Sequence, residues 1–346
     1  MPVNDENHVM SVLPAVSAVI ANRNGVEHLR VCLPSLRAQS YANVEIVVVD
    51  NASSDDSQRV AEAYGAKWLP LQKNVGLAPA LNKGASAATG ECLLFVNNDM
   101  RFDERFVESL VQLLLEDASI FAVDGMQYNW DGTEKGHLAT WISTRRAEGL
   151  CLELVPGLFL QQSESLYPVP VLMASAASMM VRRSLFEKLG GFDERLPLSY
   201  EDVDICWRAW IHGWKTVYVP EAICWHRVGS SCRSPEASRL LFVGILKGRL
   251  AFATKLLPAR HAALTWAASS AGLAKDMARM RWGFAWSRIK VLAEFALKIS
   301  EFLQAKNELY RTRGTDAATH LDEMLQLGYA RIVEKPWSSS TEKVAS

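Results

Sequence analysis

The amino-acid sequence predicts an α/β fold with a Rossmann-like, mostly parallel sheet flanked by helices. Short apolar runs alternate with segments of helical periodicity through about the first hundred residues, which is typical of βαβ units. A polar turn segment follows each apolar run. The chain has 346 residues, 49% of them hydrophobic, which is enough for one large or two modest domains. In such a fold the crossovers are right-handed and ligands bind beyond the carboxyl ends of the strands.

Strands and helices are expected in strict alternation. The runs at residues 15–21 and 44–49 are rich in Val and Ile, as buried parallel strands are. Between them, a helix over 27–39 places three leucines on one face. The series continues with a helix over 56–64, a strand over 67–71, a helix over 77–88 and a strand over 92–96.

Polar side chains follow every expected strand. In any one loop Asn, Asp, Ser and Gly are ordinary turn formers, but four such loops at one sheet edge indicate a ligand site. The four segments are residues 22–25, 50–55, 74–76 and 97–99. The patterns G-x-G-x-x-G and G-x-x-x-x-G-K-[ST] do not occur in the sequence, which argues against those two kinds of phosphate loop.

Two groups of carboxylates are expected to face the same crevice. Asp99 follows the strand over 92–96, and Glu201, Asp202 and Asp204 open a segment of helical periodicity. An Asp at the end of a strand is a natural ligand of a divalent cation, and a second Asp can remove a proton from a hydroxyl. The pattern predicts metal-assisted transfer from a phosphate-activated donor. The alternative for the second group is helix capping, since Asp and Glu are favoured at helix N-termini.

The ordered set of motifs resembles family 2 glycosyltransferases, nearest to a rhamnosyltransferase-like group that acts in surface-polysaccharide assembly. The resemblance covers roughly residues 15–257. It is carried by DNASSD at 50–55, NVGLAPALNKG at 74–84, FVNND at 95–99, AASMMVRR at 176–183, GGFDE at 190–194, YEDVDICWR at 200–208 and His226. It implies a GT-A type fold, a nucleoside-diphosphate sugar donor, a divalent cofactor (Mg²⁺ or Mn²⁺) and transfer with inversion.

The resemblance also implies roles for residues of the donor half. Asp50 would accept hydrogen bonds from the nucleobase, and Asp99 matches the last Asp of the DxD-type metal element. His226 matches a position that completes the metal site in some members, with a structural histidine as the alternative. The expected donor-binding set is Asn22, Asp50, Asn51, Asn74, Gly76, Asn82 and Asn98.

In the acceptor half, the resemblance makes Asp202 the catalytic base. Glu201 is expected to orient the base or contact the acceptor. Trp207 is expected either to stack on an acceptor sugar or to belong to the core.

Two positions depart from the family pattern. Asn97 and Asn98 precede Asp99, so this element offers a single carboxylate and its metal affinity is expected to be modest. Arg23 stands where relatives often carry an aromatic residue, and its guanidinium could reach a phosphate instead.

Charge and periodicity divide the chain unevenly. Residues 239–314 hold fourteen Lys and Arg against four Asp and Glu, a net charge of +10, and the rest carries −11. The expected organisation is a glycosyltransferase domain over 10–257, with halves 10–125 and 126–257, a basic helical extension over 258–335 and a tail over 336–346. The extension, with its interleaved aromatics, predicts contact with an anionic membrane surface or a homo-oligomer interface.

The remaining features predict a cytoplasmic enzyme, with peripheral contact at the inner face of the membrane. Six cysteines form no CxxC pair, no secretory signal precedes the first apolar segment, and prolines interrupt the longest uncharged stretch, residues 165–181. The expected partners are a dTDP-rhamnose or UDP-sugar donor and a glycan or lipid-linked saccharide acceptor, with no nucleic acid. The alternatives are a catalytically silent nucleotide-sugar-binding scaffold and a nucleotidyltransferase, which would normally carry a Gly-rich phosphate loop.

Overall fold

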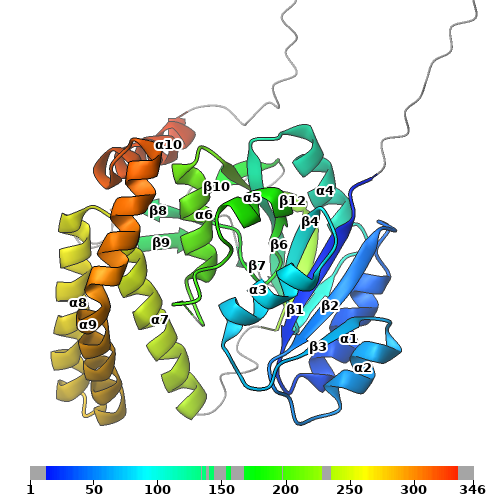
Figure 1. The fold of residues 1–346 in the computed structure, drawn as a ribbon, viewed down its shortest axis with the longest axis horizontal. Coiled ribbons are helices and arrows are strands. Elements are labelled where there is room, and N and C mark those ends of the chain that lie inside the picture. The colour runs from blue at the N-terminus through cyan, green and yellow to red at the C-terminus, as the bar shows by residue number, and fades with distance from the viewer. Residues whose placement is uncertain are drawn as a thin grey trace, which may run out of the picture.

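A mixed ten-stranded sheet with helices on both faces forms the centre of the molecule (Figure 1). The computed structural model describes residues 13–133, 135–137, 140–143, 153–156, 167–196, 198–227 and 235–333. The main path of the sheet runs β10-β12-β6-β11-β4-β1-β2-β3, with β5 paired to β12 and β7 to β6. The expected tail over 336–346 lies outside the described residues.

The first half of the sheet is parallel, as predicted. Its strands are β1 (Val16–Asn22), β2 (Val44–Asp50), β3 (Lys67–Pro70) and β4 (Cys92–Asn97), and its helices are α1 (Val26–Arg37), α2 (Ser57–Ala63) and α3 (Leu77–Ala87). Asn22 is in register with Asp50, and Ala21 with Asn97. The polar residues that follow β1, β2 and β4 therefore emerge at one edge.

The second half adds strands that the periodicity did not predict. β11 (Met180–Arg182) is inserted antiparallel between β4 and β6 (Ile120–Asn129), and β12 (Lys215–His226) lies parallel to β6. The other elements of this half are β5 (Met100–Phe102), α4 (Phe106–Glu116), β7 (Lys135–His137), β10 (Val169–Val171), α5 (Arg183–Lys188) and α6 (Glu201–Ile211). A separate two-stranded sheet pairs β8 (Thr140–Ser143) with β9 (Glu153–Pro156).

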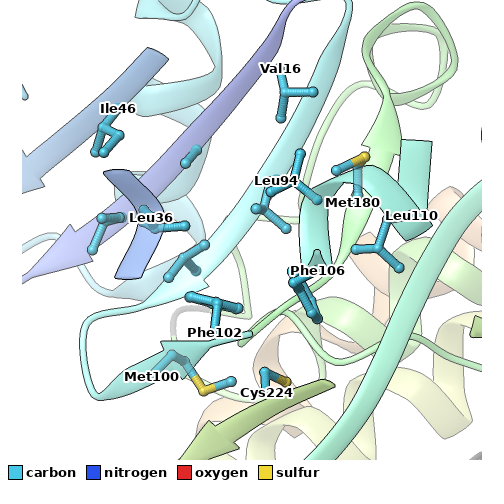
Figure 2. Close-up of a cluster of buried hydrophobic side chains, with 14 of the residues drawn as sticks. Val16, Leu36, Ile46, Leu94, Met100, Phe102, Phe106, Leu110, Met180 and Cys224 are labelled. Atoms are coloured by element: carbon cyan, nitrogen blue, oxygen red, sulfur yellow. The ribbon is translucent and has the colours of Figure 1, made fainter. Parts of the chain in front are cut away.

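Apolar side chains fill both faces of the sheet. Figure 2 shows one face, where Leu94, Phe106 and Met180 from three distant segments form a single cluster. On the other face α3 lies close to the strands, because Gly84 is directed at Val19 and Val49 and a Cβ would collide with them. The described cysteines 32, 92, 206 and 224 are free and buried, while Cys151 and Cys232 lie outside the described residues.

Four helices follow the sheet: α7 (Pro235–Leu256), α8 (Ala259–Ala278), α9 (Trp282–Arg313) and α10 (Ala317–Val333). The helical layer thus begins at Pro235, and the boundary expected at residue 257 falls in the turn between α7 and α8. α7, α9 and α10 share a core with α6, in which Trp207 packs among residues of these three helices. No helix in the described ranges is both long and apolar enough to cross a membrane.

Candidate functional site

The carboxyl edge of β1 and β4 is held together by side-chain amides. Asn22 is buried, and its Oδ1 accepts a hydrogen bond from Nδ2 of Asn98 at 2.7 Å. The backbone N–H of Asn51 donates to the carbonyl of Asn22 at 2.7 Å. These contacts bring Asn22, Asn51 and Asn98, all expected in the donor site, to one place.

Asp50 and Asn51 shape the loop after β2. The Asp50 carboxylate accepts the N–H of Ser53 at 3.2 Å and keeps further lone pairs for a ligand. Asn51 reaches the loop after β3, where its Nδ2 donates to the Gly76 carbonyl at 3.0 Å and its Oδ1 accepts the N–H of Val75 at 2.8 Å. The two loops are therefore one unit.

The loop after β3 leads into helix α3. Asn74 accepts the N–H of Gly76 through its Oδ1 at 3.1 Å. Gly76 is the residue before the helix, and its φ of 94° is a conformation that glycine adopts without strain. The N-terminus of α3 thus opens next to Asn51, where its free N–H groups favour an anion.

Asn82 lies away from this edge and has a different partner. Its Oδ1 accepts the N–H of Phe192 at 2.9 Å, and its Nδ2 donates to the Phe192 carbonyl at 2.9 Å and to Glu194 at 3.1 Å. The amide clamps α3 to the turn that contains Gly190 and Gly191, both with positive φ. The structure gives Asn82 this positioning role, while its expected contact with the donor stays a prediction.

Asp99 and His226 meet although 127 positions separate them in the sequence. Oδ1 of Asp99 lies 3.2 Å from Nε2 of His226, and the two side chains are 12% and 17% exposed. The antiparallel pairing of β5 with the end of β12 places Met100 opposite His226. In addition, the N–H of Arg227 donates to the Asp99 carbonyl at 3.1 Å.

This pair has a donor set that suits a divalent cation. A carboxylate oxygen and an imidazole nitrogen a hydrogen-bond length apart can both ligate Mn²⁺ or Mg²⁺. Within the described ranges no cluster of three or more His, Cys, Asp or Glu side chains forms a metal site. Asp99 and His226 would therefore supply two ligands of such a cation.

Two arginines and two tryptophans stack beside the pair. The Arg101 guanidinium lies 4.4 Å from the centre of the Trp225 ring and 5.1 Å from that of Trp130. The Arg227 guanidinium lies 4.4 Å from the centre of the same Trp130 ring. Arg101 is directly opposite Trp225 in the β5–β12 pairing. These cation–π contacts hold β5 on β12 and so fix the position of Asp99.

Asp202 lies at the start of α6, next to a segment that borders β4. Its Oδ2 is 3.4 Å from the N–H of Ala176, and the neighbouring Ala177 carbonyl accepts the N–H of Asn97 at 3.1 Å. The two carboxylate groups are thus linked through the backbone at residues 176–177. The N-cap residue of α6 is Tyr200, in a left-handed conformation with φ of 71°. Asp202 is therefore not the N-cap itself. It lies in the first turn of α6, where its Oδ1 accepts the N–H of Val203 at 2.8 Å, so the alternative in which these acids stabilise the helix start stays open.

Glu201 is buried, with 4% of its surface exposed. Burial and the neighbouring Asp202 charge raise the pKa of Glu201 to about 8. Its Oε2 has no hydrogen-bond partner among the described residues. An enclosed carboxyl cannot contact an acceptor from solvent, so that expected role is wrong. The other expected role, orienting the base, stays a prediction.

Trp207 belongs to the core. It is fully buried, its ring packs edge-on against Phe252 at 5.3 Å, and its indole N–H points at the Tyr310 hydroxyl at 3.4 Å. Since no acceptor can reach it, the expected stacking on a sugar is wrong and the core alternative is confirmed. The helical spacing of Trp207 within α6 could not distinguish the two, because the covering helices lie a hundred residues further along.

Asp124 also shapes the site, and the sequence pattern did not predict it. One carboxylate oxygen accepts the N–H of Ser175 at 2.7 Å and the other the Ser178 hydroxyl at 2.6 Å, while Gln127 donates to the same hydroxyl at 2.9 Å. Asp124 therefore shapes the segment that Asp202 contacts. A charged residue in the middle of the apolar strand β6 was the available signal, since a buried charge requires partners.

The chain matches the model of the glycosyl transferase family 2 over residues 17–190. It is 38% identical to the putative glycosyltransferase EpsH of Bacillus subtilis over 104 residues, which are 29% of this chain and only 30% of that protein. It is 28% identical to the N-acetylglucosaminyl-diphospho-decaprenol L-rhamnosyltransferase of Mycobacterium tuberculosis over 254 residues, 65% of this chain and 80% of that protein.

The fold resembles that of a solved glycosyltransferase. The structure of GalNAc-T7 with UDP, GalNAc and Mn²⁺ aligns with a TM-score of 0.63 at 17% sequence identity, over 96% of this chain and 59% of that one. At this identity the likeness concerns the fold, which confirms the predicted GT-A type.

Proposed function

Because this chain belongs to glycosyl transferase family 2, we propose that it transfers a sugar from a nucleoside-diphosphate donor to a hydroxyl of a glycan or lipid-linked saccharide. The observation that carries the proposal is the contact between Asp99 and His226, backbone-linked to the Asp202 helix. The names of the M. tuberculosis relative and of the GalNAc-T7 structure support a nucleotide-sugar reaction. We propose that the donor is dTDP-rhamnose or a UDP-sugar. The reaction would take place on the cytoplasmic side, in surface-polysaccharide assembly.

The donor is proposed to lie along the carboxyl edge of β1, β2 and β4. Asp50, only 7% exposed, would accept hydrogen bonds from the nucleobase. The amides of Asn22, Asn51 and Asn98 keep the loops in place, and the N-terminus of α3 behind Gly76 presents N–H groups toward the diphosphate. Asn74 supports that turn.

Asp99 and His226 would hold the divalent cation. When bound, Mn²⁺ or Mg²⁺ neutralises charge that develops on the diphosphate leaving group. The protein's part is to keep the two ligand side chains together, which the β5–β12 pairing and the Arg–Trp stack do.

Asp202 is proposed to act as the base. Its carboxylate takes the proton of the acceptor hydroxyl while that oxygen bonds to the anomeric carbon and the bond from this carbon to the donor phosphate breaks. Attack from the side opposite the leaving group inverts the anomeric centre. Glu201 next to it keeps its own proton at neutral pH, so it does not add a second negative charge to the site.

The test is nucleotide release from a panel of UDP-sugars and dTDP-rhamnose with Mn²⁺, with and without a saccharide acceptor. We expect one donor to be turned over, a loss on chelation, and a fall of about 10²-fold or more in Asp202→Asn while the donor still binds. The exposed Asp322→Asn serves as the matched control. Donor binding without turnover for any sugar would instead indicate a silent scaffold, and equal turnover in Asp202→Asn would remove it as the base.

A further inference from the structure

The start of α7, the end of α8 and the start of α9 meet at one end of the helical layer, the lower end in Figure 1. Two contacts join α7 to α9 there. Phe242 packs edge-on against Phe284 with ring centroids 5.1 Å apart, and a Cβ on Gly283 would lie 3.6 Å from the Arg239 guanidinium. We call this end the tip.

The tip exposes an unusual amount of apolar surface. Trp282 is 62% exposed, Trp286 59% and Leu240 64%. The turn between α8 and α9 adds Met280, which is 76% exposed and has a φ of 53°. Methionine is strained in this backbone conformation, whereas glycine adopts it freely. The turn therefore carries an exposed apolar side chain although glycine would be more stable there. Clustered exposed apolar groups of this kind mark interaction sites.

Cationic side chains surround these apolar groups. Arg239 and Arg279 are exposed, and Arg281 is 44% exposed, stacked 4.1 Å from the Phe284 ring. The buried acid at this end, Asp276, is already compensated by Arg288 at 2.9 Å, with Arg281 further away at 3.6 Å. Glu236 on α7, three positions before Arg239, is an exposed acid near these arginines in the sequence.

Arg288 itself is not part of the exposed surface. Its side chain is 13% exposed and also donates to the Ser269 carbonyl at 3.1 Å. The guanidinium joins α9 to α8, so it belongs to the internal packing of the layer. Arg239, Arg279 and Arg281 are available to a partner. So are two exposed lysines, Lys275 near the end of α8 and Lys290, whose ammonium lies 5.3 Å from the Trp286 ring.

We propose that the tip docks on an anionic lipid bilayer. Tryptophans and methionine would enter the boundary between headgroups and acyl chains, and the arginines would lie at the level of anionic headgroups. A second copy of the chain fits less well, because a twofold contact between tips would place arginines against arginines. The charge of the tip therefore favours a lipid surface as the occupant.

Docking at the tip would also place the site near the membrane. Eight peptide steps separate Arg227, next to the metal pair, from Pro235 at the start of α7, and such a length reaches at most about 30 Å. A lipid-linked acceptor would then present its saccharide to the enzyme at the surface in which its lipid is held. This last consequence rests on the proposed function, whereas the docking itself does not.

The experiment is co-sedimentation of the full chain with vesicles of phosphatidylcholine alone or mixed with phosphatidylglycerol. We expect binding to the mixed vesicles that weakens with salt, a loss of about fivefold or more for Arg239→Glu or Arg279→Glu, and a comparable loss for Trp282→Ser with Trp286→Ser. All four side chains are exposed, so these changes leave the core intact.

Matched controls come from the same helix. Leu297 is 86% exposed and lies about 22 Å along α9 from Trp282, so Leu297→Ser is expected to bind like the wild type. Arg311→Glu changes the same charge near the far end of α9 and is expected to do likewise.

Three outcomes would overturn the docking proposal. They are equal recovery with neutral and anionic vesicles, no recovery with either, or a stable dimer by light scattering that Trp282→Ser dissociates. Nucleotide release by the tip variants is measured in parallel. If sedimentation follows the tip charges while no donor is ever turned over, the proposed function fails and the docking stands.

Discussion

At the scale of single residues, the environment decides what each carboxylate of the site can do. Asp202 is half-buried and accepts the backbone N–H groups of Val203 and Ala176. Its neighbour Glu201 is enclosed without a partner for Oε2 in the described part of the chain, and it stays protonated to about pH 8. Glu201 therefore adds no negative charge next to Asp202 at neutral pH, which suits the base that we propose there.

The Glu201 proton gives the protein a predictable pH dependence. The folded state holds this proton up to a pKa of about 8, whereas the unfolded chain releases it near the ordinary value of 4.5. The stability that this group contributes is therefore full below about pH 4.5 and is lost as the pH rises through 8. We expect Glu201→Gln to be more stable than the wild type at pH 8 and similar to it at pH 4.5, by urea denaturation. The exposed Glu221→Gln is the control, and a constant difference across the range would refute the assignment.

The proposed metal ligands, Asp99 and His226, give a second prediction at this scale. Removing either the carboxylate in Asp99→Ala or the imidazole in His226→Ala leaves one protein ligand. We expect calorimetry to show a loss of about tenfold or more in Mn²⁺ affinity in the presence of a nucleoside diphosphate, with an unchanged melting temperature of the free protein. Unchanged Mn²⁺ affinity in both variants would remove this pair from the cation site.

At the scale of elements, a buried ionic cluster joins α6, α7 and the Gly-Gly turn. Nζ of Lys255 lies 2.7 Å from both Asp193 and Asp204, and Arg208 contacts Asp204 at 2.7 Å. Arg195 and Lys255, despite burial, hold the pKa of Asp193 well below its usual range. Arg208 also donates to the carbonyls of Leu189 and Gly191 at 2.6 and 2.8 Å. The position of α6, which carries Asp202, thus depends on α7.

Breaking this cluster should be costly. Lys255→Met leaves Asp204, which has no exposed surface, with less compensation, and one broken partner of a buried pair typically costs about 3–5 kcal/mol. Lys247→Met on the same helix breaks only the half-exposed pair with Glu294, for which we expect at most about 1 kcal/mol. The measurement is the free energy of unfolding in urea. Similar small losses for both variants would show that the cluster does not anchor α7.

At the scale of the whole molecule, the C-terminal helices and the domain that carries the site share one hydrophobic core. Trp207 of α6 is covered by Tyr310 of α9 and by Leu321 and Met324 of α10, while the Tyr310 hydroxyl donates to the Leu256 carbonyl at 2.6 Å. A chain truncated after Pro258 would expose this cluster. We expect it to lose cooperative unfolding and to aggregate, as measured by tryptophan fluorescence in urea and light scattering. A chain ending after residue 333 keeps the cluster and serves as the control. Cooperative unfolding of the shorter chain would contradict this.

The sequence by itself determined the parallel half of the sheet and the residues at its edge. Strands β1 to β4 and helices α1 to α3 were predicted to within about two residues, because periodicity and turn chemistry act over a few positions. Parallel pairing with matched ends then places Asn22, Asp50 and Asn98 at one edge. The motif runs that carry the family resemblance were also legible, since their residues are contiguous.

Only the tertiary structure decided which distant residues meet. The antiparallel insertion of β11, the pairing of β5 with β12 and the covering of α6 by α9 and α10 are contacts between segments far apart, which no local period encodes. They bring His226 to Asp99 and bury Trp207 and Glu201. They also place Asn82 against the turn at Gly190 and Gly191, and they largely bury Arg288 between α8 and α9. A side chain's chemistry follows from its type, but its availability follows from what the rest of the chain packs against it.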